Sequence, residues 1–323
     1  MIIETVEFCK KRGIKLTQIQ AVDGFERVKL LDNAVEAILI TDESKKKYLS
    51  LAVNVAKIYR AILPDPAANE FGPSQKLITI IAVKIRSLTP KADISDIMGE
   101  VEELLDHSIA TEGYIIQDPS EQSEVSKYLD LSKINFEALK EAFEKGHKRI
   151  ETEKLRASVE NKLAELVRLN KSRMDYLEKF QEMINEYNSG SHNVEFFFTK
   201  LMAFAQELNA EEKRGVAEKL TEEELAIFDL LTRPEMTLNK KEELQVKKVA
   251  QKLLETLKEE MLVLDWRKRQ QSRAAVLVSI EDTLDLLPRI YTPDLYQNKC
   301  DAIYRHVYDS YFGQGQSVYA LSV

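Results

Sequence analysis

Apolar residues recur at intervals of three or four along most of the chain, and this spacing predicts amphipathic helices rather than strands. One such stretch covers residues 25–39. A second follows Thr41-Asp42, which can cap the start of a helix, and it must end at Leu63 because Pro64 follows. These two stretches predict an antiparallel pair of helices.

A third apolar stretch starts at Pro73, a residue that suits the first position of a helix. Its apolar face is broad, which predicts a central place in a core. Asp93 can then cap a helix over residues 94–109, and the polar residues 118–126 predict a loop. We therefore predict an amino-terminal helical subdomain over 1–128 and a carboxy-terminal helical subdomain over 129–323.

The second subdomain begins with a helix that either Ser132 or Asn135 can cap. Residues 155–187 then carry apolar side chains at alternating spacings of three and four, interrupted by Asn170 and Arg173. A single coiled-coil rod would place both polar residues in its seam, whereas Asn170 can also close one helix and cap the next. The pattern favours two packed helices over one rod.

Further helices are predicted towards the end of the chain. Thr221 and Glu224 form a capping box for a helix that ends at Thr232. Three more helices are expected at 239–260, 267–286 and 292–312, with the apolar residues 261–264 between the first two as an extended connector or a buried turn. Together these elements predict an all-α helical bundle built from two packed helical subdomains.

Composition agrees with this fold and excludes several classes of protein. The chain is 44% hydrophobic and 31% charged, with only ten glycines and eight prolines in 323 residues, as a mainly helical globular protein requires. No stretch approaches the ~20 apolar residues that span a bilayer. Cys9 and Cys300 form neither a disulfide framework nor a zinc ligand set, which favours a cytoplasmic protein. A net charge of −8 argues against a surface that wraps nucleic acid.

The region from Leu225 to Phe312 closely resembles, in the order and spacing of its residues, the carboxy-terminal region of the R (restriction, or motor) subunit of type I restriction enzymes. Its centre is the string Leu-Val-Leu-Asp-Trp-Arg-Lys-Arg-Gln-Gln-Ser-Arg-Ala-Ala from Leu262 to Ala275. The run from Tyr296 to Tyr308 lies downstream of it. A weaker resemblance continues through residues 25–63 and 131–191.

The resemblance implies a role within a larger enzyme. That family couples ATP-driven DNA translocation to DNA cleavage, and this region supports the motor and helps join the R subunit to the modification methyltransferase core. The expected partners are the modification and specificity subunits, the motor part of its own subunit, and DNA in the full complex, with no membrane. ATP and Mg are expected only for the full-length subunit. Met1 is then expected to mark a split gene product or an engineered boundary.

Motifs for nucleotide or metal chemistry are absent from the sequence. No phosphate-binding Gly-x-x-x-x-Gly-Lys-Ser/Thr string occurs, and Gly313-Gln-Gly315 lacks the rest of any nucleotide fingerprint. Pro293-Asp294 followed by Lys299 imitates nuclease spacing, but a helix cap at Thr292 explains these residues better. The four histidines are expected at the surface or at helix ends: His107, His147, His192 and His306.

One cluster of residues is the candidate partner-binding site: Trp266, Arg267, Lys268, Arg269 and Arg273. On the predicted helix Arg269 and Arg273 share a face, and Trp266 lies one turn before them. Three interpretations remain open, namely a buried tryptophan with a solvated basic rim, a protein-docking surface, and contact with the DNA backbone. A metal-dependent nuclease with unfamiliar ligands is a further alternative.

Overall fold

The computed structural model describes residues 1–22, 24–63, 65–88, 131, 134–233 and 236–320. It is mostly helical with one small two-strand hairpin, so the all-α prediction is confirmed. The helix predicted at 94–109, the loop at 118–126, the boundary near residue 128 and His107 all lie outside the described residues. None of the helices described is both long and apolar enough to cross a membrane.

The chain divides into two compact units, and each is made of two stretches of sequence. Unit 1 contains Met1–Lys162 and Gln181–Gln206, and unit 2 contains Leu163–Phe180 and Glu207–Val323. Three helices contribute residues to both units: α9 (Lys148–Leu169), α10 (Met174–Asn188) and α11 (Val194–Glu218). The predicted subdomains 1–128 and 129–323 stay a prediction, because their boundary falls on residues that the structure does not describe.

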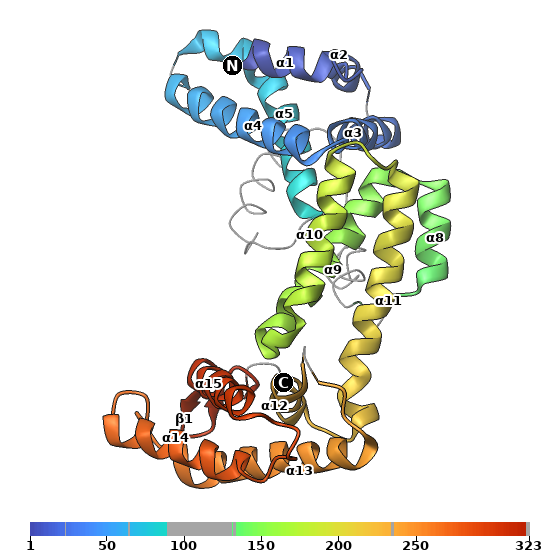
Figure 1. Ribbon diagram of the computed structural model, residues 1–323. Helices are drawn as coiled ribbons and strands as arrows, with labels where there is room; N and C mark the ends of the chain where they lie inside the picture. Colours follow the sequence, from blue (N-terminus) through green and yellow to red (C-terminus); the bar gives the residue numbers. More distant parts are fainter. Residues whose placement is uncertain (23, 64, 89–130, 132–133, 234–235, 321–323) are drawn as a thin grey trace. The chain divides into compact units, whose positions relative to one another are not determined.

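The amino-terminal helices of unit 1 pack around α5 (Gly72–Ser87), as the broad apolar face of α5 predicts. Leu77, Ile78, Ile81 and Ile85 of α5 are all 0% exposed. Pro73 lies in the first turn of this helix, and Thr41 caps α4 by accepting a hydrogen bond from the Ser44 amide at 3.2 Å. The elements of unit 1 before α9 (Figure 1) are α1 (Ile2–Lys10), α2 (Leu16–Gln20), α3 (Gly24–Ile38), α4 (Asp42–Ile62), η1 (Pro66–Phe71), α5 (Gly72–Ser87) and α8 (Phe136–Lys145).

Carboxylates of α3 and α4 fasten these helices to α9 within unit 1. The Glu36 carboxylate accepts hydrogen bonds from the backbone amides of Arg149 at 2.8 Å and Ile150 at 3.0 Å, in the first turn of α9. Asp42 forms a two-pronged ion pair with Arg156 at 2.5 and 2.8 Å. Burial alone would raise the pKa of Asp42, but the hydrogen bond and charge of Arg156 outweigh it and lower that pKa.

Unit 2 is built around α12, which is buried on nearly all sides. Leu225, Ala226, Ile227 and Leu231 are each 0% exposed. The capping box of Thr221 with Glu224 is present, as predicted. The elements of unit 2 that follow α11 are α12 (Glu222–Thr232), α13 (Lys240–Thr256), η4 (Leu257–Met261), α14 (Gln270–Leu284), α15 (Pro293–Ser310), β1 (Tyr311–Gly313) and β2 (Gln316–Ser317).

The interruption at Asn170 separates two helices, which confirms that interpretation over a continuous rod. The helix α9 ends at Leu169, and the Asn170 side chain accepts a hydrogen bond from the Ser172 amide at 3.0 Å. A short 3-10 turn, η3 (Lys171–Arg173), then leads into α10. Asn170 and Arg173 are each 0% exposed, so both polar side chains of the predicted seam enter the core of unit 2.

Two predicted boundaries near the end of the chain are wrong. The helix expected from about Arg267 begins at Gln270, and the helix expected to reach Phe312 ends at Ser310. Residues 264–268 form turns instead, with Asp265 at a φ of +57°. These turns let the Trp266 ring enter the core, and burying a large aromatic side chain outweighs the weak intrinsic preference for helix.

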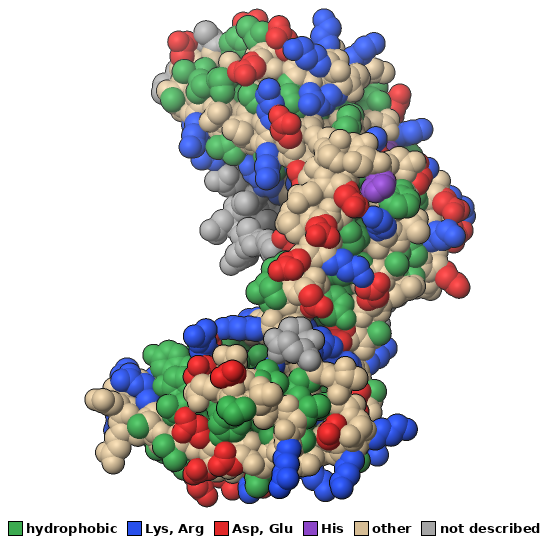
Figure 2. Space-filling model, in the orientation of Figure 1, with side chains coloured by type: hydrophobic (Ala, Val, Ile, Leu, Met, Phe, Trp, Pro, Cys, Tyr) green, Lys and Arg blue, Asp and Glu red, His purple; other side chains and the backbone are tan. Residues whose placement is uncertain are grey.

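Acidic and basic side chains are interspersed on the surface. Figure 2 shows this mixture on the face that it draws, as expected from a chain with 46 Lys and Arg and 54 Asp and Glu. A single-sign field of the kind that tracks a phosphate backbone is not visible on this face.

Candidate functional site

Trp266 lies inside unit 2, at the centre of the turn formed by residues 262–269, which we call the Trp266 turn. Its side chain is 0% exposed, and its indole N–H donates to the Tyr311 carbonyl at 3.1 Å. Tyr308 contacts it edge-on at a centroid distance of 5.9 Å. Among the three interpretations of this residue, the buried tryptophan is the one that its environment supports. Trp266 supports a surface without forming part of it.

Arg267 is fixed in place by the aromatic residues around it. Its Nε donates to the Tyr311 carbonyl at 3.0 Å, and its Cζ lies 4.5 Å from the ring centroid of Phe312 and 5.1 Å from that of Tyr308. Its Nη2 is buried and has no hydrogen-bond partner among the residues that the structure describes. The electron-rich ring faces are the electrostatic partners of this guanidinium.

The other basic residues of the predicted site differ in their surroundings. Lys268 is exposed and pairs with Asp265 at 2.9 Å, while Arg269 is exposed at the N-cap position of α14. Arg273 donates from Nη1 to the Arg267 carbonyl at 3.0 Å. Trp266, Arg267 and Lys268 precede the helix, so the helix does not include them as predicted. Arg269 and Arg273 do lie one helical turn apart, because the Arg273 amide donates to the Arg269 carbonyl at 3.1 Å. The contact between Arg267 and Arg273 is what brings the basic residues together.

A groove of about 300 Å³ lies beside the Trp266 turn, and we call it the arginine groove. It is lined by Arg273, Tyr304, Arg305, Tyr308 and Asp309. Tyr304 and Tyr308 stand one turn apart on α15, with ring centroids separated by 6.4 Å. The sequence-based site omitted Arg305, which directly follows Tyr304 on α15.

Apolar side chains are exposed around the Trp266 turn and the start of β1. Val263 is 46%, Leu264 54% and Phe312 41% exposed, and Tyr308 of the arginine groove is 38% exposed. The turn and β1 are in close contact: a Cβ on Gly313 would lie 2.6 Å from the Val263 carbonyl oxygen, and the Gln314 amide donates to the Leu262 carbonyl at 3.1 Å. The exposed apolar and basic side chains therefore lie on two closely packed segments, the Trp266 turn and β1.

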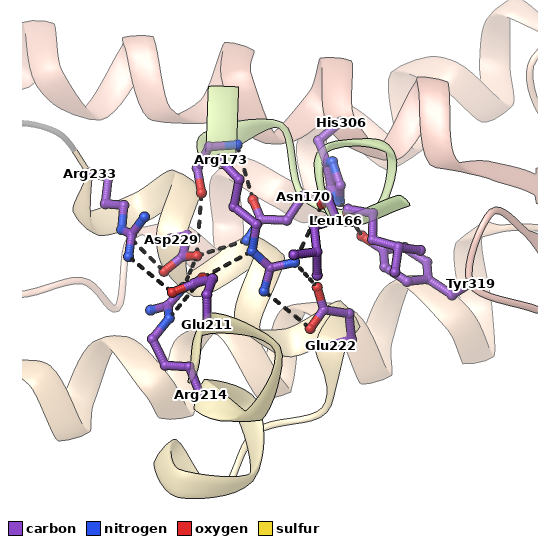
Figure 3. Close-up of polar contacts among 12 residues, drawn as sticks. Leu166, Asn170, Arg173, Glu211, Arg214, Glu222, Asp229, Arg233, His306 and Tyr319 are labelled. Carbon is purple, nitrogen blue, oxygen red and sulfur yellow. Dashed lines mark hydrogen bonds and ion pairs between the residues drawn. The ribbon is translucent and has the colours of Figure 1, made fainter. Parts of the chain in front are cut away.

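A second polar cluster, the buried polar network, lies in the interior of unit 2 (Figure 3). Its members are Asn170, Arg173, Glu211, Arg214, Glu222 and Asp229. The Arg173 side chain is only 1% exposed; its Nε donates to Glu211 at 2.9 Å, its Nη2 to Glu222 at 3.3 Å and its Nη1 to the Leu166 carbonyl at 3.4 Å. Burial alone would lower the pKa of Arg173, but the bonds and charges of Glu222 and Glu211 outweigh it and raise that pKa.

Asp229 is the second buried carboxylate of the network and accepts several hydrogen bonds. It is 0% exposed and accepts hydrogen bonds from Asn170 at 2.7 Å and Ser172 at 3.3 Å, and it also pairs with Arg214. The Arg233 Nε lies 3.7 Å from its other oxygen. The carboxylates of this cluster are therefore matched by guanidinium groups, and their chemistry is that of structural ion pairs that hold helix ends together.

His306 is buried beside this network, which corrects the expectation of a surface or helix-end residue. Its Nε2 lies 3.0 Å from the Tyr319 hydroxyl, which donates to the Leu169 carbonyl at 2.7 Å. Because that hydroxyl proton is used, the imidazole N–H must donate to the Tyr319 oxygen, and the Ser310 hydroxyl can donate to Nδ1 at 3.4 Å. Burial lowers the pKa of His306 to about 4, so the ring is neutral near pH 7.

The residues weighed for nuclease or nucleotide chemistry have structural roles. Thr292 caps α15 by accepting from the Leu295 amide at 3.4 Å, and Lys299 is buried and donates to the Arg233 carbonyl at 2.8 Å. Gly313 and Gly315 form the tight turn between β1 and β2, with φ angles of +98° and +74°. Within the described part of the chain, no group of three or more His, Cys, Asp or Glu is arranged to hold a metal ion.

Comparison with protein families gives a match over residues 1–310. The matching family is described as type I restriction enzyme HindI endonuclease subunit-like, C-terminal. Neither the curated proteins nor the solved structures gave a match. The family match covers the arginine groove, the Trp266 turn and the buried polar network.

Proposed function

This chain belongs to the family of carboxy-terminal regions of type I restriction enzyme endonuclease subunits, and from that premise we propose that it is a helical docking and scaffold module. In this proposal it joins the motor part of a restriction subunit to the modification and specificity subunits and has no catalytic site of its own. ATP hydrolysis and DNA cleavage would then belong to other parts of the complex.

The observation that carries this proposal is the surface formed by the Trp266 turn and α15. Tyr308 and Phe312 are partly exposed, and Arg267 is stacked against both. Exposed aromatic residues beside arginine are enriched among the residues that dominate the binding energy of protein interfaces. The buried ring of Trp266 supports this surface, so its side chains are held in position before a partner arrives.

A direct test uses the whole chain and the purified modification and specificity subunits. We expect a stable complex in size-exclusion chromatography and no ATP hydrolysis or DNA cleavage by the chain alone. Turnover that survives repurification and disappears on mutating a residue of this chain would contradict the scaffold role. Absence of any complex would contradict the docking role.

The alternative is a module that binds DNA through its basic residues. The exposed side chains of Lys268 and Arg269 favour it, but Lys268 is already paired with Asp265 at 2.9 Å. Salt-dependent binding to duplex DNA that is lost on Arg269→Glu and Arg273→Glu would establish this alternative.

A further inference from the structure

We propose that the arginine groove is the recognition site for an acidic segment of the partner protein. One Asp or Glu of that segment would bind Arg273 and Arg305, and a neighbouring apolar side chain would pack on Tyr304 and Tyr308. This inference rests on the proposed docking function and specifies which residues recognise the partner and what chemistry the partner offers.

The two guanidinium groups of the groove are available to an incoming carboxylate. Among the described residues neither Arg273 nor Arg305 forms an ion pair, whereas Arg173 and Arg214 of the same unit are paired with acids. The one carboxylate that lines the groove, Asp309, forms an ion pair with Lys171. A partner carboxylate would therefore meet two cations that lack an acidic counterpart.

Arg273 is already oriented for this role. Its Nη1 donates to the carbonyl of Arg267, which is itself fixed by Tyr311 and by the rings of Tyr308 and Phe312. Holding a long side chain in place before binding removes part of the conformational entropy that its immobilisation would otherwise cost. Its remaining donors can then form a charge-assisted, two-pronged bond with a carboxylate.

The aromatic residues provide a platform for an apolar side chain next to that carboxylate. Tyr308 is 38% exposed and rests edge-on against buried Trp266, with Tyr304 one turn before it. Phe312 is also partly exposed, and its ring contacts Arg267 as the Tyr308 ring does. A rigid aromatic platform favours burial of a hydrophobic side chain in addition to the ion pair.

The groove suits a protein segment better than a nucleic acid. Its volume of about 300 Å³ is at the small end for a ligand site and fits one or two side chains. Asp309 lines it, and Asp301 is exposed one turn before Arg305 on α15. A phosphate backbone would need a continuous row of cations and would be repelled by these acids, whereas a single carboxylate needs only the two arginines.

The test compares Arg305→Glu with the control Arg289→Glu, which makes the same charge change at another exposed arginine of unit 2. Binding of each 323-residue variant to the immobilised complex of modification and specificity subunits is measured by biolayer interferometry. We expect Arg305→Glu to weaken binding by about tenfold or more, and Arg289→Glu to leave it unchanged. A Lys substitution at one Asp or Glu of the partner should restore binding to Arg305→Glu.

The other outcomes separate this inference from the docking proposal. Wild-type affinity for Arg305→Glu would overturn the groove assignment while leaving docking in place. Failure of the wild-type chain to bind would overturn both. If Arg305→Glu instead lost affinity for a duplex DNA probe alone, the groove would be a nucleic-acid site. Should Arg305→Glu unfold, Arg305→Gln replaces it; reduced binding then supports the inference and unchanged binding overturns it.

Discussion

Arginine side chains have opposite surroundings in the buried polar network and in the arginine groove. Arg173 is 1% exposed and bonded to Glu211 and Glu222, whereas Arg305 is exposed and no described carboxylate pairs with it. Removing a buried, paired guanidinium takes an ion-pair partner away from a buried acid, while changing an exposed one leaves the interior intact. The comparison separates residues that hold the fold from residues that are available to a partner.

The largest effect on stability is expected from removing an arginine of the buried polar network. Arg173→Ala removes an ion-pair partner from the buried Glu211 and from the partly exposed Glu222, and we expect the free energy of unfolding to fall by about 3–5 kcal/mol. Urea denaturation at pH 7 measures this change. Arg289→Ala, at an exposed arginine, is the control and should change it by less than about 0.5 kcal/mol. A loss below about 1 kcal/mol for Arg173→Ala would mean that the network is not a structural clamp.

A second prediction concerns the protonation of His306 near the network. Its pKa in the folded chain is about 4, below the ordinary value of 6.5, so the folded state binds this proton less readily than the unfolded state. Its contribution to stability is therefore complete above pH 6.5 and is lost as pH falls towards 4, by about 3 kcal/mol in total. Lys171 lowers this pKa further and Asp309 raises it.

His306→Gln separates this effect from the titration of other groups. The free energy of unfolding should decline less steeply between pH 6.5 and 4 in the variant than in the wild-type chain. Parallel pH profiles for the two proteins would show that His306 accepts a proton in the folded state without cost.

A smaller effect is expected where the backbone supports the Trp266 turn. Gly313 has a φ of +98°, and a Cβ there would lie 2.6 Å from the Val263 carbonyl oxygen. We expect Gly313→Ala to cost about 1–3 kcal/mol and to change the fluorescence of Trp266, the single tryptophan of the chain. Gly315→Ala is the matched control, since its φ is +74° but a Cβ would meet no atom within 4 Å. Equal losses at the two glycines would exclude a role for the Val263 contact.

The smallest effect on folding is expected at the exposed basic residues of the Trp266 turn. The double reversal Lys268→Glu and Arg269→Glu should change the free energy of unfolding by only about 0.5 kcal/mol, measured by thermal denaturation with circular dichroism. Its effect on partner binding should be weaker than that of Arg305→Glu, because these residues lie outside the arginine groove. A greater loss of binding than with Arg305→Glu would place the docking centre at the turn.

Local signals predicted much of the helical framework from the sequence. The caps at Thr41, Asn135, Thr221 and Thr292 act at short range, and each is formed by its own side chain. The start of α14 could not be found in this way. Residues 267–269 carry no helix breaker, and only the burial of Trp266 against Tyr311 shows why the helix begins later.

The partners of polar residues in the buried polar network could not be predicted from the sequence either. Asn170 and Arg173 interrupt an apolar pattern, which was the available sign that something unusual occurs there. Their partners Asp229 and Glu222 lie 59 and 49 residues away, and spacing along the chain cannot identify such pairs. Arg305 was missed for a similar reason, because the groove exists only once α14 and α15 are packed together.

The bond between Tyr319 and the end of α9 has a consequence for the order in which the chain is made. The Tyr319 hydroxyl donates to the Leu169 carbonyl across 150 residues, and Leu169 shares its hydrophobic core with residues as late as Tyr319. A ribosome must therefore synthesise the chain as far as Tyr319 before unit 2 can close. Until α15 is made, the apolar residues of α12 lack the part of their packing that α15 supplies, and nascent chains are most open to aggregation or chaperone capture during this interval.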